Sequence, residues 1–328
     1  MPCAGTGAYF KSALQSALSQ THREFRILVC DNACPHNHYS KVVRDINDPR
    51  VEYIRFEERL QMIANWQRCA AKAEADFYCF LHDDDLWEAN FLSSCLSLLG
   101  GEGTNFVLAM HQTFHGDAEV ALQSADNDLL CQWRALEALS WMDCRVLLAF
   151  GTFAHMSCAL FRRILVTFDQ TRAWNPDQKF IFEYGRVGKG RLSAQTCVHL
   201  RMHAGTGTAS FLAAKASQET LTLIRENLID LVRADIVVAP TIQRLAKLAG
   251  SGALFRVLHA VHSWPLTPEL MDIGRTLLAD PSLKREVAKY SLIARTLAYM
   301  PSTVWIAASL AVDLTYYREI ARDRRRTR

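Results

Sequence analysis

The chain has 328 residues, of which 50% are hydrophobic and 22% are charged, and its formal net charge at pH 7 is +3. This length exceeds the usual single domain of about 100–200 residues and predicts one full-sized domain with a second, smaller one. The balance of hydrophobic and charged residues excludes a disordered or collagen-like chain. A net charge this small says nothing by itself about nucleic acid, because phosphate binding needs a concentrated basic face, and we expect no nucleic-acid partner.

The ten cysteines are spread singly along the chain, without any Cys-x-x-Cys pair. This spacing argues against a zinc site, and most of the cysteines lie in apolar runs, where a free thiol behaves as a small buried hydrophobic group. The N-terminus shows no basic segment followed by an apolar one, and no apolar stretch reaches the ~20 residues that cross a bilayer. We therefore expect a cytoplasmic protein with reduced thiols.

Helical and strand-like patterns alternate from the N-terminus. Apolar residues at four-residue spacing predict a helix over residues 9–18, and an apolar run predicts a strand over Phe25–Cys30. Further strands are expected to begin near Val51, Phe77 and Phe106, with helices over residues 39–46, 61–73 and 88–99. Strand starts about 26–29 residues apart are typical of βα units, and nearly continuous apolar runs indicate strands buried on both faces. The sequence therefore predicts an α/β fold with a mostly parallel sheet flanked by helices.

The C-terminal third has a different pattern. From about Gln218 onward strand signals are weak, and apolar residues recur every three or four positions between Leu221 and Leu231. Thr267-Pro268-Glu269 and Asp280-Pro281 are each typical of a helix start, with a capping residue followed by proline at the first helical position. We expect a catalytic or binding domain over residues 1–212 and a helical C-terminal extension over residues 213–328.

An apolar strand from Phe77 to Leu81 runs directly into His82, Asp83, Asp84 and Asp85. Three adjacent carboxylates repel one another, and Mg²⁺ or Mn²⁺, which prefer oxygen ligands, would give the fold a reason to hold them together. In extended backbone Asp83 and Asp85 point to one side and Asp84 to the other, so only one or two of them bind a single ion. The alternative is a solvated turn in which one aspartate caps the helix that follows.

A second aspartate, Asp31, stands directly after the strand that ends at Cys30. Ligands of parallel α/β sheets bind beyond the carboxyl ends of the strands, so Asp31 is placed to accept hydrogen bonds from a nucleotide base or ribose. The alternative is an Asx-type turn, for which the pair Asp31-Asn32 is well suited. The residues alone leave both alternatives open.

Several stretches of the chain carry a further pattern. They are SALSQTHREF at residues 16–25, ILVCDNA at 27–33, NWQR at 65–68, HDDDLW at 82–87 and, more weakly, residues 157–163 and RMHAG at 201–205. Together they resemble the family 2 glycosyltransferases of the GT-A fold, over roughly residues 1–212. That family opens with an apolar central strand, whereas this chain begins at the turn that follows it, so the first strand is expected to be missing. The family's usual serine is replaced by Cys34.

The resemblance implies a donor site and a metal site. The implied nucleotide-sugar ligands are Asp31, Asn32, Asn65 and Asp83, and the implied ligands of a Mg²⁺ or Mn²⁺ ion are Asp84, Asp85 and His203. For His203 the alternative is a core or loop histidine. Trp66, at helical spacing with other apolar residues, is expected in the core.

Asp177 matches the position of the family's general base, an acidic residue near a helix start that deprotonates the acceptor hydroxyl. This role needs an ionised carboxylate within hydrogen-bond reach of the attacking oxygen. The alternative is a plain helix start, with Asn175 as the cap, Pro176 at the first position and Asp177 facing the positive end of the helix dipole.

The resemblance implies an inverting glycosyltransferase that moves a sugar from a nucleotide-diphosphate sugar to a saccharide, lipid-linked or other hydroxyl acceptor. Synthesis of a cell-surface polysaccharide or glycoconjugate is the expected setting. The alternative is a non-catalytic, truncated glycosyltransferase-like protein with a binding or scaffolding role.

The end of the chain combines apolar, aromatic and basic residues. An apolar stretch with aromatic residues from Val304 to Ile320 overlaps an arginine-rich end from Arg318 to Arg328. Basic residues near an anionic leaflet contribute about 1 kcal/mol each, so this segment predicts peripheral attachment to an anionic membrane surface at the inner face of the cell membrane. The alternative is a core-packed final helix with a solvated arginine tail.

Overall fold

The computed structural model describes residues 1–101, 103–116, 133–149, 155–164, 166–172, 175–203, 213–236, 260–261 and 267–279. The chain divides into two compact units. The first is formed by Met1–Leu148 and Thr152–Ala209, and the second by Ala149–Gly151 and Ser210–Arg328. The predicted domain boundary after residue 212 stays a prediction.

The first unit contains a three-stranded parallel sheet. Its strands are β1 (Pro2–Cys3), β2 (Ile27–Asp31) and β3 (Val51–Arg55), in the order β1-β2-β3. The strands expected near residues 25 and 51 are thereby confirmed. The position beside β2, where the first strand was expected to be missing, is taken by the two residues of β1, and the Met1 amino group donates to the carbonyl of Leu28 at 2.8 Å.

A five-stranded sheet forms the other β-structure in the described residues of this unit. Its strands are β4 (Phe77–Cys79), β5 (Leu86–Trp87), β6 (Thr104–Phe114), β7 (Ala159–Arg162) and β8 (Lys189–Arg201), in the order β4-β7-β6-β8-β5. Only the β6–β8 pair is parallel, and the other three neighbouring pairs are antiparallel. The predicted parallel arrangement therefore holds for the three-stranded sheet and for the β6–β8 pair. The sequence does not predict the antiparallel pairs, because periodicity locates strands without giving their direction of pairing.

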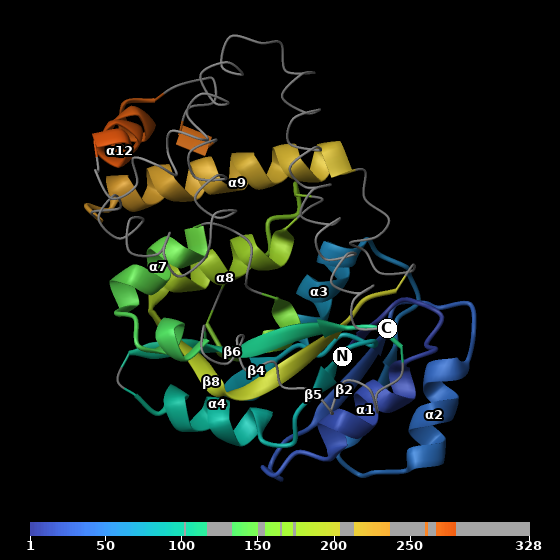
Figure 1. Ribbon diagram of the computed structural model, residues 1–328. Helices are drawn as coiled ribbons and strands as arrows, with labels where there is room; N and C mark the ends of the chain where they lie inside the picture. Colours follow the sequence, from blue (N-terminus) through green and yellow to red (C-terminus); the bar gives the residue numbers. More distant parts are fainter. Residues whose placement is uncertain are drawn as a thin grey trace, which may run out of the picture. The chain divides into compact units, whose positions relative to one another are not determined.

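Helices flank both sheets. The described helices of the first unit are α1 (Phe10–Leu18), α2 (His38–Ile46), α3 (Met62–Ala71), α4 (Phe91–Leu99), α7 (Trp141–Ala149) and α8 (Pro176–Val187), with a 3₁₀ turn at Met156–Cys158. The predicted helices before residue 100 are confirmed. Figure 1 shows α4 on one side of the β6–β8 pair and α8 on the other, so both faces of this pair are covered.

The core follows the predicted apolar patterns. Phe10, Ala13, Leu14 and Ala17 form the buried face of α1, as their four-residue spacing predicts. Trp66 is 6% exposed and packs against Phe80, Phe168 and the ring of His82, in agreement with a core position. All the cysteines in the described part of the chain are free thiols, and all of them except Cys79 are buried.

The second unit is helical where the structure describes it. Helix α9 (Ala213–Arg233) buries Ile224, Leu228 and Leu231, three of the apolar residues that recur at helical spacing, and helix α12 (Pro268–Ala279) packs against it. The predicted helix start at Thr267 is confirmed, since its hydroxyl accepts a hydrogen bond from the Leu270 amide at 3.4 Å. The predicted start at Asp280 and the membrane segment from Val304 to Arg328 lie outside the described residues. No helix in the described ranges is long and apolar enough to span a membrane.

Gly190 of β8 gives a test of this packing. It pairs with Phe106 of β6, and a Cβ at Gly190 would lie 2.2 Å from Cζ of the Phe106 ring, which is 1% exposed. We expect Gly190→Ala to lower the free energy of unfolding by about 1–3 kcal/mol, because the buried ring has little room to move. Urea denaturation measures this value.

The variant Phe106→Leu serves as the partner in a double-mutant cycle. In the Phe106→Leu background, the cost of Gly190→Ala should fall, since the ring is gone. An equal cost in both backgrounds would contradict the close approach of this ring to the β8 backbone.

Candidate functional site

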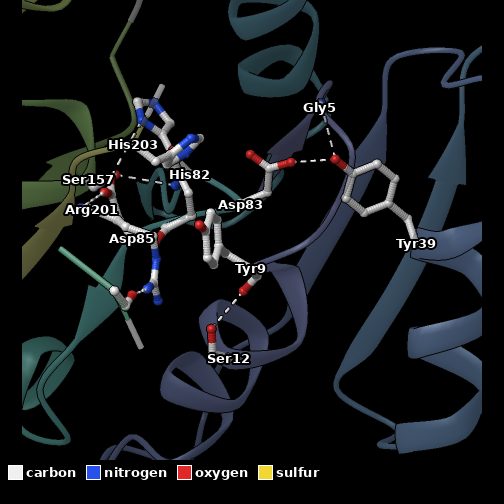
Figure 2. A network of polar contacts seen from close by, with 12 residues as sticks. Gly5, Tyr9, Ser12, Tyr39, His82, Asp83, Asp85, Ser157, Arg201 and His203 are labelled. Atoms are coloured by element: carbon white, nitrogen blue, oxygen red, sulfur yellow. Dashed lines mark hydrogen bonds and ion pairs between the residues drawn. The ribbon is translucent and has the colours of Figure 1, made fainter. Parts of the chain in front are cut away.

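The three consecutive aspartates after β4 each face a different part of the first unit. Figure 2 shows Asp83 pointing toward Tyr39, and Asp85 toward Ser157 and Arg201. The aspartates therefore do not share one environment, and each has its own partners.

Asp83 is held by the N-terminal half of the unit. The hydroxyl of Tyr39, on α2, donates a hydrogen bond to Oδ2 of Asp83, and the backbone amide of Gly5 donates to the same hydroxyl at 3.1 Å. Burial raises the pKa of the Asp83 carboxyl, although the hydrogen bond from Tyr39 opposes this shift. The turn after β1 and helix α2 thus fix the position of this carboxylate.

Asp84 faces His203, at the end of β8. Nε2 of His203 lies 3.1 Å from Oδ2 of Asp84, and Arg201 Nε donates to the backbone carbonyl of Asp84 at 2.9 Å. Burial, and then the negative charge of Asp85, raise the pKa of the Asp84 carboxyl. The Asp84 side chain remains 23% exposed, so it is accessible to a ligand from solvent.

Asp85 is buried and tightly bound. The hydroxyl of Ser157 donates to Oδ2 of Asp85 at 2.6 Å, and the backbone amide of Arg201 donates to Oδ1 at 3.1 Å. Nδ1 of His82 lies 3.6 Å from the same Oδ2 atom. Asp85 therefore connects the aspartate loop to the 3₁₀ turn and to β8, a structural task that the sequence does not reveal.

These residues fit a divalent cation. His82, Asp84 and Asp85 each offer one ligand atom, and these atoms all lie within 4.8 Å of one another. Carboxylate oxygens are the ligands that Mg²⁺ and Mn²⁺ prefer, and a cation would relieve the repulsion that raises the pKa of Asp84. The structure groups Asp84 and Asp85 with His82, whose only signal in the sequence is its place before the aspartates, and it places His203 against Asp84. Metal binding by Asp84, Asp85 and His203 stays a prediction.

Aromatic rings and one arginine support His203. The Arg201 guanidinium lies over the rings of Tyr9, at 4.2 Å, and Phe114, at 4.5 Å, and it donates a hydrogen bond to the carbonyl of Gly116. The Tyr9 ring is 5.0 Å from that of His203. Tyr9 therefore joins α1 to the candidate site, which the helical pattern of residues 9–18 gives no reason to expect.

Asp31 is fully buried at the end of β2. Its Oδ1 accepts a hydrogen bond from the Cys34 amide at 2.8 Å, as in the predicted turn, and its Oδ2 accepts from Tyr53, at 2.6 Å, and Arg55, at 3.1 Å. Ala33 adopts a left-handed conformation, with φ of 51°, between these residues. The turn interpretation is thus confirmed, and a contact between Asp31 and a nucleotide stays a prediction.

Asn32 and Asn65 belong to one hydrogen-bonded group. Asn32 exchanges two hydrogen bonds with the backbone of Leu60, at 2.8 and 2.9 Å. Arg68 Nη2 donates to the side-chain oxygens of both Asn32, at 2.7 Å, and Asn65, at 2.9 Å. The two asparagines predicted for the donor site therefore lie close together, and Arg68 orients both.

Asp177 is in the first turn of α8, where we predict it. Oδ1 of Asp177 accepts a hydrogen bond from the Gln178 amide at 3.0 Å, and Oδ2 lies 3.7 Å from Nδ1 of His155. The segment that begins at His155 also contains Ser157, which binds Asp85. One short segment thus connects the predicted base to the aspartate cluster, and no sequence pattern indicates the contact between Asp177 and His155.

The first half of the chain matches a known protein family. Residues 1–165 match the family model described as glycosyl transferase family 2. The chain belongs to glycosyl transferase family 2. The resemblance of the motifs in residues 16–87 is thereby confirmed at the level of the family.

Individual relatives of this family 2 chain are distant. It is 26% identical over 121 residues to the UDP-Glc:alpha-D-GlcNAc-diphosphoundecaprenol beta-1,3-glucosyltransferase WfgD of Escherichia coli. The match covers 37% of this chain and 47% of WfgD, so it spans about half the length of the curated relative.

Solved structures show the same fold. The structure of S. aureus TarS 1-349 in complex with UDP-GlcNAc matches with a TM-score of 0.59 and 12% identity, covering 97% of this chain and 90% of that one. The mannosyltransferase PcManGT from Pyrobaculum calidifontis, in complex with GDP-Man and Mn²⁺, matches with a TM-score of 0.53 and 13% identity, covering 94% and 82%. These likenesses confirm the predicted α/β fold of the GT-A glycosyltransferases.

The neighbours Asp84 and Asp85 should respond to substitution in opposite ways. Asp85→Ala leaves the Ser157 hydroxyl and the Arg201 amide without their acceptor, so we expect it to lower the free energy of unfolding by about 2 kcal/mol or more. A raised pKa means that the folded state disfavours the ionised carboxylate. Above that pKa Asp84 therefore costs stability, and Asp84→Ala should leave the free energy of unfolding unchanged or higher.

Urea denaturation at pH 7, with divalent ions removed by a chelator, compares the two variants directly. Equal destabilisation by Asp84→Ala and Asp85→Ala would contradict the different roles that we assign to them.

Proposed function

We propose that this chain is a metal-dependent, inverting glycosyltransferase that moves a sugar from a nucleotide-diphosphate sugar to an acceptor hydroxyl. Membership of glycosyl transferase family 2 supports the reaction class. The observation that carries the proposal is the convergence of Asp84, His203, His82 and Asp85 at the end of a strand, with the pKa of Asp84 raised by burial and by like charge. A divalent cation stabilises such a group of side chains, and it also binds the diphosphate of a nucleotide sugar.

In this proposal the donor lies along the ends of β2 and β4. Asp31, Asn32 and Asn65 lie on the side of the nucleotide base, and Arg68 and Tyr53 orient them. Asp83, which Tyr39 holds in place, faces the ribose and the diphosphate. The fold likeness to TarS and PcManGT, whose structures contain UDP-GlcNAc and GDP-Man, supports a nucleotide sugar as the ligand.

Asp84 and His203 would hold the Mg²⁺ or Mn²⁺ ion, with His82 and Asp85 beside them. When bound, such an ion supplies positive charge that stabilises the departing diphosphate. Asp85 contributes mainly by keeping the loop in place, because both of its oxygens already accept hydrogen bonds from Ser157 and Arg201.

Asp177 acts as the general base. Its Oδ2 takes the proton of the acceptor hydroxyl, the freed oxygen attacks the anomeric carbon, and the bond from that carbon to the diphosphate oxygen breaks. A single displacement of this kind inverts the configuration of the anomeric carbon. Asp177 lies in the first turn of α8, and Nδ1 of His155 is 3.7 Å from its Oδ2 atom.

The proposal also covers the acceptor of the sugar and the location of the protein in the cell. The name of WfgD describes transfer from UDP-Glc to a diphosphoundecaprenol-linked GlcNAc, which supports a lipid-linked saccharide among the hydroxyl acceptors considered for this chain. Such an acceptor fits a cytoplasmic enzyme held at the inner face of the cell membrane by the basic segment from Arg318 to Arg328, and it fits synthesis of a cell-surface polysaccharide or glycoconjugate.

A second candidate is a non-catalytic binding or scaffolding protein with the same fold. One observation favours it: both carboxylate oxygens of Asp31 and the side-chain amide of Asn32 are already hydrogen-bonded within the chain. If no nucleotide sugar displaces or extends these contacts, the donor site does not function.

The central test of catalysis is Asp177→Asn. The amide has nearly the same shape but cannot take a proton, so we expect transfer to fall by about 10²–10⁴-fold while donor binding stays near its original value. A panel of nucleotide sugars with Mn²⁺ is screened by thermal shift for binding and by nucleoside diphosphate release for turnover.

Glu183→Gln, on the same helix, is the matched control and should keep full turnover, because Glu183 pairs with Lys179 and Arg186 rather than with the site. Full turnover in Asp177→Asn would show that Asp177 is only a helix-start carboxylate. Failure of the original chain to bind any nucleotide sugar would favour the second candidate.

A further inference from the structure

Three side chains away from the aspartate cluster converge between β5 and β8. The antiparallel pairing of Leu86 with His199 and of Trp87 with Val198 places Glu88 opposite Cys197. Cys197 and His199 are two residues apart on a strand, so their side chains lie on the same face of β8. One ligand atom from each of Glu88, Cys197 and His199 lies within 4.8 Å of the other two.

His199 provides the observation that points to a ligand. It is 2% exposed, and its Nε2 atom is buried without a hydrogen-bond partner. The Glu88 Oε1 atom lies 3.6 Å from this nitrogen, which is too far for a hydrogen bond. The opposite ring nitrogen, Nδ1, is held by the Gln112 side chain at 2.9 Å, so the ring is fixed with Nε2 directed at Glu88.

Glu88 and Cys197 each place a ligand atom near the His199 ring. The backbone amide of Cys197 donates to Glu88 Oε2 at 2.8 Å, which leaves Oε1 turned toward His199. Cys197 is 4% exposed, and its thiol donates to the backbone carbonyl of Val198 at 3.6 Å. A cation at this point would replace the thiol proton, because a metal-bound thiol loses it.

The geometry and the ligand types fit zinc. A tetrahedral Zn²⁺ ion takes nitrogen and oxygen ligands at about 2.0–2.2 Å and sulfur at about 2.3 Å, so its ligand atoms lie roughly 3.3–3.7 Å apart. The 3.6 Å between Glu88 Oε1 and His199 Nε2 falls in this range. Thiolate and imidazole ligands favour Zn²⁺ over Mg²⁺ or Mn²⁺. The Glu88 side chain is 36% exposed, which gives an ion a route from solvent and leaves a fourth position for water.

We propose that Glu88, Cys197 and His199 form a zinc site that is separate from the aspartate cluster and links β5 to β8. On binding, the Cys197 thiol releases its proton to solvent as the Zn–S bond forms. The proton of the His199 ring then resides on Nδ1, and the Gln112 amide turns its oxygen toward it. The ion ties the two strands beside the hydrogen bond from the Arg201 amide to Asp85.

Cobalt tests the site without any nucleotide. The purified full chain is stripped of metal with a chelator and titrated with Co²⁺, which replaces Zn²⁺ and gives a thiolate-to-cobalt charge-transfer band in the near ultraviolet. The aspartate cluster contains no cysteine, so it cannot produce this band. We expect the band to saturate at one equivalent and to disappear when Zn²⁺ is added.

Variants identify the ligands. Cys197→Ala should abolish the band, whereas Cys95→Ala, which changes a buried cysteine of α4, should keep it. Glu88→Gln changes a partly exposed residue and preserves an acceptor for the Cys197 amide, so it folds even if Cys197→Ala does not, and it should weaken Co²⁺ binding about tenfold or more. Absence of the band in the original chain, its persistence in Cys197→Ala, or unchanged Co²⁺ affinity in Glu88→Gln would overturn the proposal.

Discussion

Repulsion among three consecutive carboxylates is the constraint on which the arrangement of the first unit depends. Asp83, Asp84 and Asp85 can be held at the end of one strand only if other elements bring partners to them. Tyr39 comes from α2, His203 from the end of β8, and Ser157 from the 3₁₀ turn. Segments from the beginning, middle and end of this unit therefore meet at one place, and that place is where the proposed reaction would use a cation and a diphosphate.

Strand β8 connects the two candidate metal sites. Cys197, His199 and Arg201 alternate with the buried apolar residues Val198 and Leu200, so the strand carries polar groups on one face and core on the other. At one end of the polar face, Cys197 and His199 lie beside Glu88, so that sulfur, nitrogen and oxygen atoms converge. At the other end, Arg201 donates hydrogen bonds to Asp84 and Asp85 of the aspartate cluster. The different ligand types would keep a soft ion and a hard ion apart.

Much of this arrangement follows from the sequence, and the remainder depends on register and long-range pairing. Periodicity predicts β2, β3, β4 and the helices α1 to α4, but not the two-residue strands β1 and β5, which are too short to show a period. The position of Asp31 and the Asp83–Asp85 run after strands predicts a site. The antiparallel direction of β5 and β7 has no periodic signal. Glu88 and Cys197 are 109 residues apart in the sequence. A rule based on short spacings, such as the search for Cys-x-x-Cys pairs, therefore cannot detect that they converge. Ser157 and His155 gain their partners in the same way, through the fold alone.

In the proposed mechanism, Asp84 is the residue that makes nucleotide binding require a divalent ion. Isothermal titration calorimetry of UDP and of GDP, each with and without Mn²⁺, measures this dependence in the original chain and in Asp84→Ala. One of these nucleotides should bind the original chain at least tenfold more tightly with Mn²⁺ present, and Asp84→Ala should lose this gain in affinity. Equal affinity with and without Mn²⁺, or a full gain in Asp84→Ala, would contradict it.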